Sequence, residues 1–165
     1  ALQNSAKRSA IRSTWLKLSS VKFHHVFVIG DKEGRSEDLR EEIREYGDIL
    51  LLPNTSDTYD FLTAKVLRVF VQLNKIWKFK FLLKCDDDSF VRVANIVFEL
   101  ESQFRNVNNL YWGFFHGSAV VKRRGKWKET KWNLCDRYLP YALGGGYILS
   151  KSLVQFIAEN ERYLV

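Results

Sequence analysis

Short apolar segments alternate with amphipathic segments through the first two thirds of this sequence. The pattern predicts strands at 21–30, 48–52 and 79–84, and helices at 5–17, 36–47, 59–77 and 90–104. Ser36 is a favourable residue for capping the start of the second helix, and Gly47 is favourable for ending it. Alternating strands and helices favour an α/β fold, in which helices cover both faces of a mostly parallel sheet.

The pattern changes beyond residue 109. Three segments there have the composition of strands: LYWGFF (110–115), the basic and hairpin-like VVKRRGKWKETKW (120–132), and YALGGGYIL (141–149). A last helix is expected at 152–164. The length of 165 residues suits a single domain.

Composition limits the functional classes. The formal net charge of +7 favours anionic partners such as phosphates, acidic substrates or polyanions. No apolar run reaches the roughly 18 residues of a membrane-spanning helix, so we expect any anchoring segment to lie upstream. The two cysteines, Cys85 and Cys135, fit no zinc-binding spacing, and they could pair with each other, elsewhere, or not at all. Asn54 begins an Asn-Thr-Ser sequon on an expected loop and is a candidate glycosylation site in a secretory compartment.

Three consecutive aspartates, Asp86, Asp87 and Asp88, follow an expected apolar strand. Ligands bind outside the carboxyl ends of strands in open α/β sheets, so this position indicates a site. Strand alternation would point Asp86 and Asp88 to one side, an arrangement that suits Mg²⁺ or Mn²⁺ completed by nucleotide phosphates. The alternative is a solvated turn in which Asp88 or Ser89 caps a helix beginning near Phe90. The pattern alone leaves both interpretations open.

Three glycines, Gly144, Gly145 and Gly146, interrupt an aromatic segment. They either form a bulge or let the main chain approach a ligand closely, and the bulge is the simpler account. The sequence has no G-x-G-x-x-G, P-loop, G-x-S-x-G or H-E-x-x-H motif, which disfavours the nucleotide-binding and hydrolase classes that use them.

Four motifs occur together, in this order: KRSAIRSTW (7–15), DTYDFLTAK (57–65), KCDDDSFVRV (84–93) and YLPYALGGGYILS (138–150). Taken together they resemble the β1,3-glycosyltransferases of glycosyltransferase family 31, over essentially the whole chain. Three stretches are most similar to the family's galactosyltransferases of the glycosaminoglycan linkage region: LYWGFF (110–115), VVKRRGKW (120–127) and LCDRYLPYALGGGY (134–147).

The resemblance implies a GT-A fold, with a nucleotide-sugar-binding half at about 1–109 and the start of an acceptor-binding half at about 110–165. It implies an enzyme of the Golgi membrane, anchored by a segment upstream of this chain, with its catalytic domain in the lumen. The donor would be UDP-galactose and the cofactor Mn²⁺. Galactose would be transferred in β1,3 linkage, with inversion, to the galactose of galactosyl-xylosyl-serine on a proteoglycan core protein.

By the same resemblance, Asp86, Asp87 and Asp88 match the metal- and donor-binding D-x-D motif of the family. Asp88 would ligate the metal directly, and Asp86 would contact the metal or the ribose. The cation would neutralise the diphosphate and make UDP a better leaving group. Arg8 and Arg12 match basic positions near the nucleotide, where a positive charge suits a diphosphate, although simple surface solvation competes for Arg12.

The resemblance also implies residues beside the donor sugar and the acceptor. The matching positions are Tyr141, Gly144, Gly145 and Gly146. Candidates for stacking on sugar rings are Trp112, Trp127 and Trp132. The alternative for each tryptophan is a place in the core. The basic stretch 122–131 would attract an acidic core protein or a phosphorylated linkage sugar, against the alternative of a solvated hairpin.

The sequence departs from the family pattern at several positions. Phe61 stands where an Asn is usual, and Cys85 where a small residue such as Ala is expected. An inverting displacement needs a base that deprotonates the acceptor hydroxyl, and the family's E-D-V-x-x-G motif for that base has no match here. We expect this motif beyond Val165 and the first strand of the fold before Ala1, so the catalytic residue is unknown and the chain is expected to be a fragment.

Two other functions stay open. One is a β1,3-N-acetylglucosaminyltransferase of the same family, which would differ in the donor sugar. The other is a non-catalytic polyanion-binding module, suggested by the net charge of +7. Binding to nucleic acid is disfavoured because no recognition motif accompanies that charge.

Overall fold

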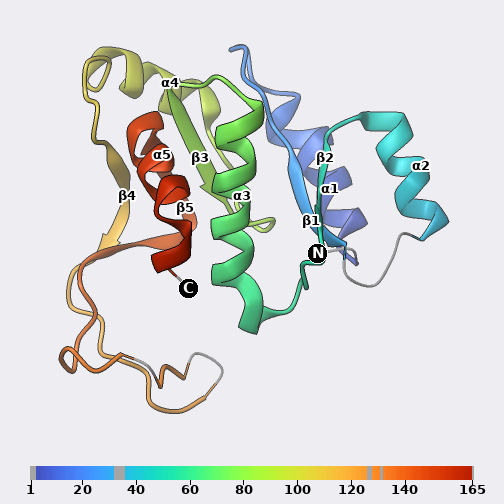
Figure 1. Ribbon diagram of the computed structural model, residues 1–165. Coiled ribbons are helices and arrows are strands. Elements are labelled where there is room, and N and C mark those ends of the chain that lie inside the picture. The colour runs from blue at the N-terminus through green and yellow to red at the C-terminus, as the bar shows by residue number, and fades with distance from the viewer. Residues whose placement is uncertain (1–2, 32–35, 126–127, 131, 165) are drawn as a thin grey trace.

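The computed structural model describes residues 3–31, 36–125, 128–130 and 132–164. In this part of the chain, five strands form two separate sheets, one of two strands and one of three. Figure 1 shows the two sheets next to each other, with helices packed around them. The predicted α/β class is therefore confirmed.

Helices and strands alternate as far as the third strand, as the sequence predicts. The helices are α1 (Ser5–Ile11), continued by a π-helical turn at Arg12–Leu16, then α2 (Glu37–Tyr46), α3 (Leu62–Ile76), α4 (Val93–Ser102) and α5 (Lys151–Glu159). Short 3₁₀ helices lie at Tyr59–Phe61 and Glu161–Tyr163. The strands are β1 (Phe27–Asp31), β2 (Ile49–Pro53), β3 (Phe81–Cys85), β4 (Tyr111–His116) and β5 (Tyr141–Ser150).

The ends of α2 lie where the sequence predicts them. The Oγ atom of Ser36 accepts a hydrogen bond from the Leu39 amide at 3.3 Å, which satisfies a donor of the first turn. Gly47 follows the helix with φ at 63°, a left-handed conformation that glycine adopts without strain. The amide of Gly47 donates to the Ile43 carbonyl at 3.0 Å, and β2 begins two residues later.

The sequence-based prediction of a mostly parallel sheet is wrong for the described residues. In the described residues only β1 and β2 pair in parallel, whereas β5 lies antiparallel between β3 and β4. The reason is the connection from β4 to β5, which contains no helix in its described residues and returns the chain in the opposite direction. Strands from both sides of the predicted division near residue 109 share this sheet, and that division remains a prediction.

The three glycines of β5 form a bulge. Gly113 of β4 lies opposite Tyr147, and Phe115 lies opposite Ala142. Four residues of β5, 143–146, therefore stand against the single residue Phe114 of β4. This confirms the structural alternative for the glycine triplet.

Two local expectations are corrected. No strand lies at 120–132 in the described residues; an isolated bridge between Val120 and Arg137 and a 2.7 Å main-chain bond from Glu129 to Lys122 hold this segment instead. Figure 1 shows the connection between β4 and β5 extending away from the body of the molecule. Helix α4 begins at Val93, three residues later than expected, so neither Asp88 nor Ser89 caps it.

The core consists of three apolar clusters. The largest joins Ile11 and Trp15 to Val91 and Val93 beneath β3. A second forms where α5 packs on α3, and a third lies where α4 packs on β4 and β5. In the described residues, no helix is both long enough and apolar enough to cross a bilayer.

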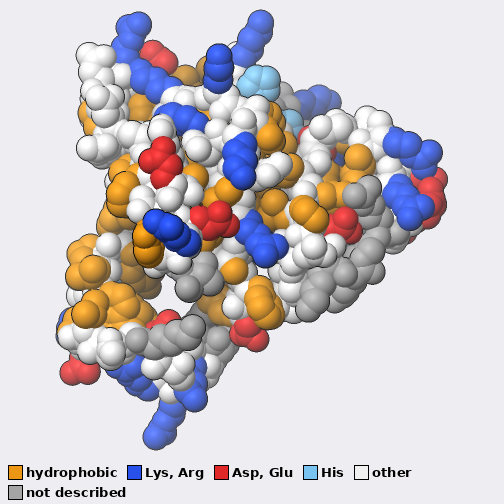
Figure 2. All heavy atoms as spheres, viewed as in Figure 1, with side chains coloured by type: hydrophobic (Ala, Val, Ile, Leu, Met, Phe, Trp, Pro, Cys, Tyr) orange, Lys and Arg blue, Asp and Glu red, His pale blue; other side chains and the backbone are white. Residues whose placement is uncertain are grey.

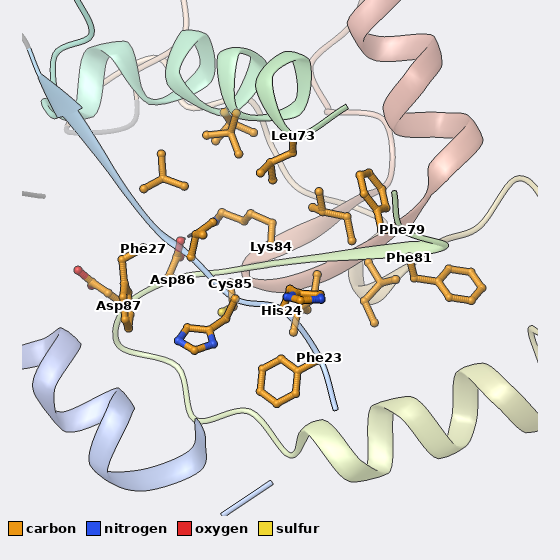
Figure 3. Close-up of a pocket in the computed structure, with 18 of the residues that line it drawn as sticks. Phe23, His24, Phe27, Leu73, Phe79, Phe81, Lys84, Cys85, Asp86 and Asp87 are labelled. Carbon is orange, nitrogen blue, oxygen red and sulfur yellow. Dashed lines mark hydrogen bonds and ion pairs between the residues drawn. The ribbon is translucent and has the colours of Figure 1, made fainter. Parts of the chain in front are cut away.

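A cavity of about 940 Å³ separates the two sheets. Its sides are β1 and β3, and α3 lies on one face with α1 and α4 on the other (Figure 3). Each of these strands pairs along one edge only in the described residues. All five residues of β3 are only half-buried, which is unusual for a strand as apolar as Phe-Leu-Leu.

The open edges make the expected additional strand before Ala1 testable. The Phe27 amide donates to Asp48 at the β2 side, so by alternation the main chain of Val28 points to the other edge, as does that of Leu83 in β3. We predict that natural residues preceding Ala1 pair with these edges, slowing hydrogen exchange at the Val28 and Leu83 amides at least tenfold. The Leu82 amide, already bonded to β5, is the control, and unchanged exchange at Val28 and Leu83 in the longer protein would contradict the prediction.

Candidate functional site

The three aspartates lie in a turn, and not in the strand itself. Strand β3 ends at Cys85, and the Ser89 amide donates to the Asp86 carbonyl at 3.3 Å. Strand alternation therefore does not determine where the Asp86 and Asp88 side chains point, because the strand ends one residue before Asp86. The position beyond the carboxyl end of β3 is nevertheless the predicted one.

Helix α1 holds the middle aspartate. The Lys7 ammonium lies 2.8 Å from Oδ1 of Asp87, and the Asn4 amide donates to Oδ2. Burial alone would raise the pKa of Asp87, but the hydrogen bonds from Lys7 and Asn4 outweigh it and lower the pKa below its ordinary value. Both oxygens of Asp87 are thus engaged in fixing the turn to α1.

The glycine bulge of β5 meets the same turn. The Lys84 ammonium lies 2.5 Å from Oδ1 of Asp86 and 2.8 Å from the Gly144 carbonyl oxygen. The Ser89 hydroxyl donates to the Gly145 carbonyl at 2.7 Å. A methyl group on Gly144 would lie 3.1 Å from Oδ2 of Asp86, closer than most side-chain contacts. The structure therefore brings together the aspartates and two of the three predicted glycines.

Some carboxylate oxygens of the turn accept no hydrogen bond from any residue that the structure describes. They suit a hard divalent cation that keeps coordination positions open for other ligands. Asp88 is exposed, and among the described residues no hydrogen bond reaches its carboxylate or Oδ2 of Asp86. Across that same part of the chain, no group of three or more His, Cys, Asp or Glu side chains could enclose a metal. Two carboxylates would thus hold Mg²⁺ or Mn²⁺ only with further oxygens, which phosphates and water supply readily.

The polar turn forms one end of the cavity between the sheets. Figure 3 shows Asp86 and Asp87 at this end and Phe79 and Phe81 at the other. Arg8 lines the cavity together with the three aspartates, but most of the wall is apolar. A diphosphate placed among the apolar side chains would exchange its water for few hydrogen bonds, so the apolar part of the cavity does not suit a nucleotide.

The two predicted arginines belong to a buried charge network. Arg8 is buried, with only 3% of the residue exposed. Its guanidinium donates through Nε to Glu42 at 2.8 Å. Arg12 donates to both oxygens of Asp48 at 2.7 Å and to Glu42 at 2.8 Å. Its guanidinium also lies 3.9 Å from the ring centre of Tyr46. The network joins α1 and the π-helical turn after it to α2 and to Asp48, the residue before β2. Arg12 does not line the cavity at the aspartates.

This network lowers the pKa values of its carboxylates. Hydrogen bonds from Arg8, and then Arg12, lower the pKa of Glu42 against the effect of burial. Burial alone would raise the pKa of Asp48, but Arg12, helped by His25, outweighs it and lowers that pKa as well. Both carboxylates therefore favour their charged forms in the folded protein.

Tyr59 is a residue near the site that the sequence interpretation missed. It begins the 3₁₀ helix before α3 and lines the cavity beside the aspartates. Burial, with the nearby charge of Asp86 and the hydroxyls of Tyr138 and Tyr141, raises its pKa. Its place in the motif DTYDFLTAK is the sequence signal that could have identified it.

Tyr141 belongs to a row of aromatic rings at the start of β5. Its ring stacks on His116 at 6.4 Å between ring centres and meets Tyr138 edge-on at 5.9 Å. Tyr138 in turn meets Trp132 edge-on at 5.3 Å. Tyr141 is 38% exposed, so this row offers an aromatic face to solvent.

The remaining predicted positions have separate environments. Trp112 packs on Phe104 within an apolar cluster, which is the core alternative given for it. Trp127 lies outside the described residues. Asn54 is exposed after β2 with φ at 52°, and Cys85 and Cys135 are both free thiols.

Lys84 and Lys7, which bind the aspartate turn, were also not identified from the sequence. Lys84 stands two residues before Asp86, a spacing that puts both side chains on one side of an extended chain. That spacing was visible in the sequence. The contact between Lys7 and Asp87 joins residues 80 positions apart, and no local pattern predicts it.

Comparison with known proteins gives a consistent result. A family model described as "Galactosyltransferase" matches residues 6–164. The chain is 43% identical over 166 aligned residues to beta-1,3-galactosyltransferase 6 of Mus musculus, covering 96% of this chain and 51% of that protein. It is 35% identical over 126 residues to UDP-GalNAc:beta-1,3-N-acetylgalactosaminyltransferase 2 of Xenopus laevis, covering 76% of this chain and 26% of that protein.

A plant relative is similar at a lower level. The chain is 32% identical over 163 residues to hydroxyproline O-galactosyltransferase GALT5 of Arabidopsis thaliana, covering 94% of this chain and 24% of that protein. The chain thus spans about half the length of the mouse relative and about a quarter of the other two.

The charge network predicts an acid-dependent loss of stability. We expect Glu42→Gln to destabilise the fold by about 3 kcal/mol at pH 7, because two buried arginines lose a charged partner. The pKa of Glu42 is lowered from 4.5, so its contribution is complete above that value and is lost as the pH falls through the lower folded-state pKa. The variant's deficit, measured by urea unfolding, should therefore shrink as the pH is lowered from 4.5 through the folded-state pKa.

Glu41→Gln is the matched control, since Glu41 is exposed on the same helix. It should leave stability within about 0.5 kcal/mol of the wild-type value. A deficit in Glu42→Gln that stays constant over this pH range would show that the network is not the source of the pH dependence.

Proposed function

This chain belongs to the galactosyltransferase family, and we propose that it provides the donor-binding site of a UDP-galactose-dependent β1,3-galactosyltransferase. The observation that carries the proposal is the meeting of the Asp86–Asp88 turn with the glycine bulge of β5. The mixed α/β architecture agrees with a GT-A-like domain. The 43% identity to a mouse protein named as a β1,3-galactosyltransferase supports the sugar and the linkage.

Asp88 and Asp86 are the residues proposed to hold Mn²⁺. When bound, the cation supplies positive charge to the diphosphate and makes UDP a better leaving group. Asp87 keeps the turn against α1 through Lys7 and Asn4. Arg8 is hydrogen-bonded to Glu42 and so helps to position that helix. We assign Arg12 the same positioning role.

The proposed acceptor is the galactose of galactosyl-xylosyl-serine on a proteoglycan core protein. The aromatic row of Tyr141, Tyr138 and Trp132 suits a sugar, because aromatic rings offer apolar faces with polar edges. Gly144 leaves space beside Asp86 that a side chain would fill, and Gly145 and Gly146 face Ser89 and Cys85 in the same way. We place the donor sugar between the bulge and this row.

Exposed basic residues beyond the row are proposed to attract an acidic acceptor. The described ones are Lys122, Arg123, Arg124 and Lys128. Figure 2 shows Lys and Arg side chains gathered on the connection between β4 and β5. Exposed charges of one sign raise the rate of encounter with an oppositely charged partner and add little to the chemistry.

The proposed location is the lumen of the Golgi apparatus, with a membrane anchor upstream of this chain. Asn54, exposed on its loop, is then available for glycosylation. An inverting transfer also needs a base at the acceptor hydroxyl. We propose that this base comes from residues that follow this chain in the complete enzyme.

Calorimetric titration of UDP into this chain tests the donor site. We expect binding with Mn²⁺ and at least tenfold weaker binding after chelation, because the diphosphate and the carboxylates repel one another without a cation. Asp88→Asn should abolish the Mn²⁺-dependent part, whereas Asp136→Asn, the same change at an exposed residue, should not. Unchanged binding in a folded Asp88→Asn variant would remove the metal assignment.

Donor hydrolysis rates separate the closest alternatives. UDP-galactose should be hydrolysed faster than UDP-N-acetylglucosamine or UDP-N-acetylgalactosamine, the latter being the donor named for the Xenopus relative. A preference for either N-acetylated sugar would overturn the proposed donor. Heparin binding that is unaffected by Asp88→Asn and by chelation, without UDP binding, would favour a non-catalytic polyanion-binding module.

A further inference from the structure

Lys84 turns its side chain inward at the end of β3. Its ammonium lies 2.5 Å from Oδ1 of Asp86 and 2.8 Å from the Gly144 carbonyl oxygen. The side chain is only 19% exposed, against 46% for Lys7 at the same turn. An ammonium gives up its water only where fixed acceptors replace it, so this lysine is held as an internal cation.

The two acceptors of Lys84 belong to the two halves of the proposed donor site. Asp86 is in the turn after β3, and Gly144 is in the bulge of β5. A methyl group on Gly144 would lie 3.1 Å from Oδ2 of Asp86 and 3.7 Å from the Lys84 ammonium. Turn, ammonium and bulge are therefore in contact, and displacing the ammonium changes the surroundings of both.

Lys84 holds Oδ1 of Asp86 while Oδ2 is open among the described residues, so a divalent cation bound at Oδ2 would share this carboxylate with the ammonium. Asp87 is engaged by α1, so the turn offers a cation only Asp86 and Asp88. Within the described residues, the sole hydrogen bond to the Asp86 carboxylate comes from Lys84. A cation bound to Asp86 would lie within a few ångströms of the ammonium, and two positive charges at that separation repel each other strongly.

We propose that the Lys84 ammonium neutralises Asp86 in the metal-free protein and is driven away from Oδ1 by charge repulsion when a divalent cation binds the same carboxylate. The inference rests on the proposed function, because it takes Asp86 as part of the divalent-cation site. Lys84 acts through Asp86 and is a positioning residue. Its second bond gives the exchange a further consequence: cation binding also removes the partner of the Gly144 carbonyl and frees the bulge to adjust.

Binding of Mn²⁺ alone tests this exchange without any nucleotide or activity. Free Mn²⁺ is measured by electron paramagnetic resonance during titration of the wild type, Lys84→Met and Lys84→Gln. We expect both variants to bind Mn²⁺ roughly tenfold more tightly, since a nearby positive charge has been removed. Lys80→Met, the same charge change at an exposed residue just before β3, should bind as the wild type does.

The direction of the change separates this role from a structural one. A lysine that only shapes the turn would weaken Mn²⁺ binding when replaced, and equal or weaker binding in the folded variants overturns the proposal. Loss of the circular dichroism spectrum in both variants also overturns it, because a cation that Mn²⁺ displaces cannot be one that the fold requires.

Hydrogen exchange at the Gly145 and Gly146 amides gives a second readout. Mn²⁺ should change their exchange in the wild type, where Lys84 leaves Gly144, and leave it unchanged in Lys84→Met. Calorimetry with UDP then distinguishes the two proposals. Mn²⁺-dependent UDP binding by the wild type, with unchanged Mn²⁺ affinity in the variants, overturns the role of Lys84 alone, whereas absence of both Mn²⁺ and UDP binding in all proteins overturns both.

Discussion

Main-chain pairing of β5 between β3 and β4 is the constraint on which the candidate site depends. β5 is the last strand in the described chain, yet it bonds to both neighbours and forms the centre of its sheet. This pairing brings Gly144 to within hydrogen-bonding distance of Lys84, 60 residues earlier in the chain. Hydrogen bonds along two strand edges thus fix the bulge against the aspartate turn more firmly than side-chain contacts alone could.

Most positive charges near the aspartates are already paired within the protein. Lys7 binds Asp87, Lys84 binds Asp86, and Arg8 binds Glu42. The net charge of +7 is therefore a poor guide to the charge of the site. Exposed positive charges lie on the connection between β4 and β5. Charges there affect the rate of encounter with a charged partner.

Features set by neighbouring residues could be predicted from the sequence. The caps of α2 at Ser36 and Gly47 depend on one turn of helix, and the bulge follows from three adjacent glycines. The position of the aspartates beyond β3 was predicted too, because an apolar run marks that strand. The orientation of Asp86 and Asp88 was not, since the strand ends at Cys85 and a turn follows.

Features set by distant residues could not be predicted. The alternating pattern identifies β5 as a strand but does not identify its partners, so a mostly parallel sheet was expected where an antiparallel one forms. The roles of Arg8 and Arg12 depend on Glu42 and Asp48, which approach them only in the folded chain. A basic residue in a motif indicates a charge, and its partner decides whether that charge serves the ligand or the fold.

The connection between β4 and β5 has its two ends fixed by the sheet, while its middle projects from the molecule. Lengthening such a connection costs little, since each doubling of a flexible loop adds only about 0.6 kcal/mol. Insertions, deletions and substitutions in this segment are therefore compatible with an unchanged sheet and an unchanged aspartate turn. Homologous chains can in this way differ in the molecules they recognise while keeping the same aspartate turn, because the projecting segment is where such divergence is least constrained by folding.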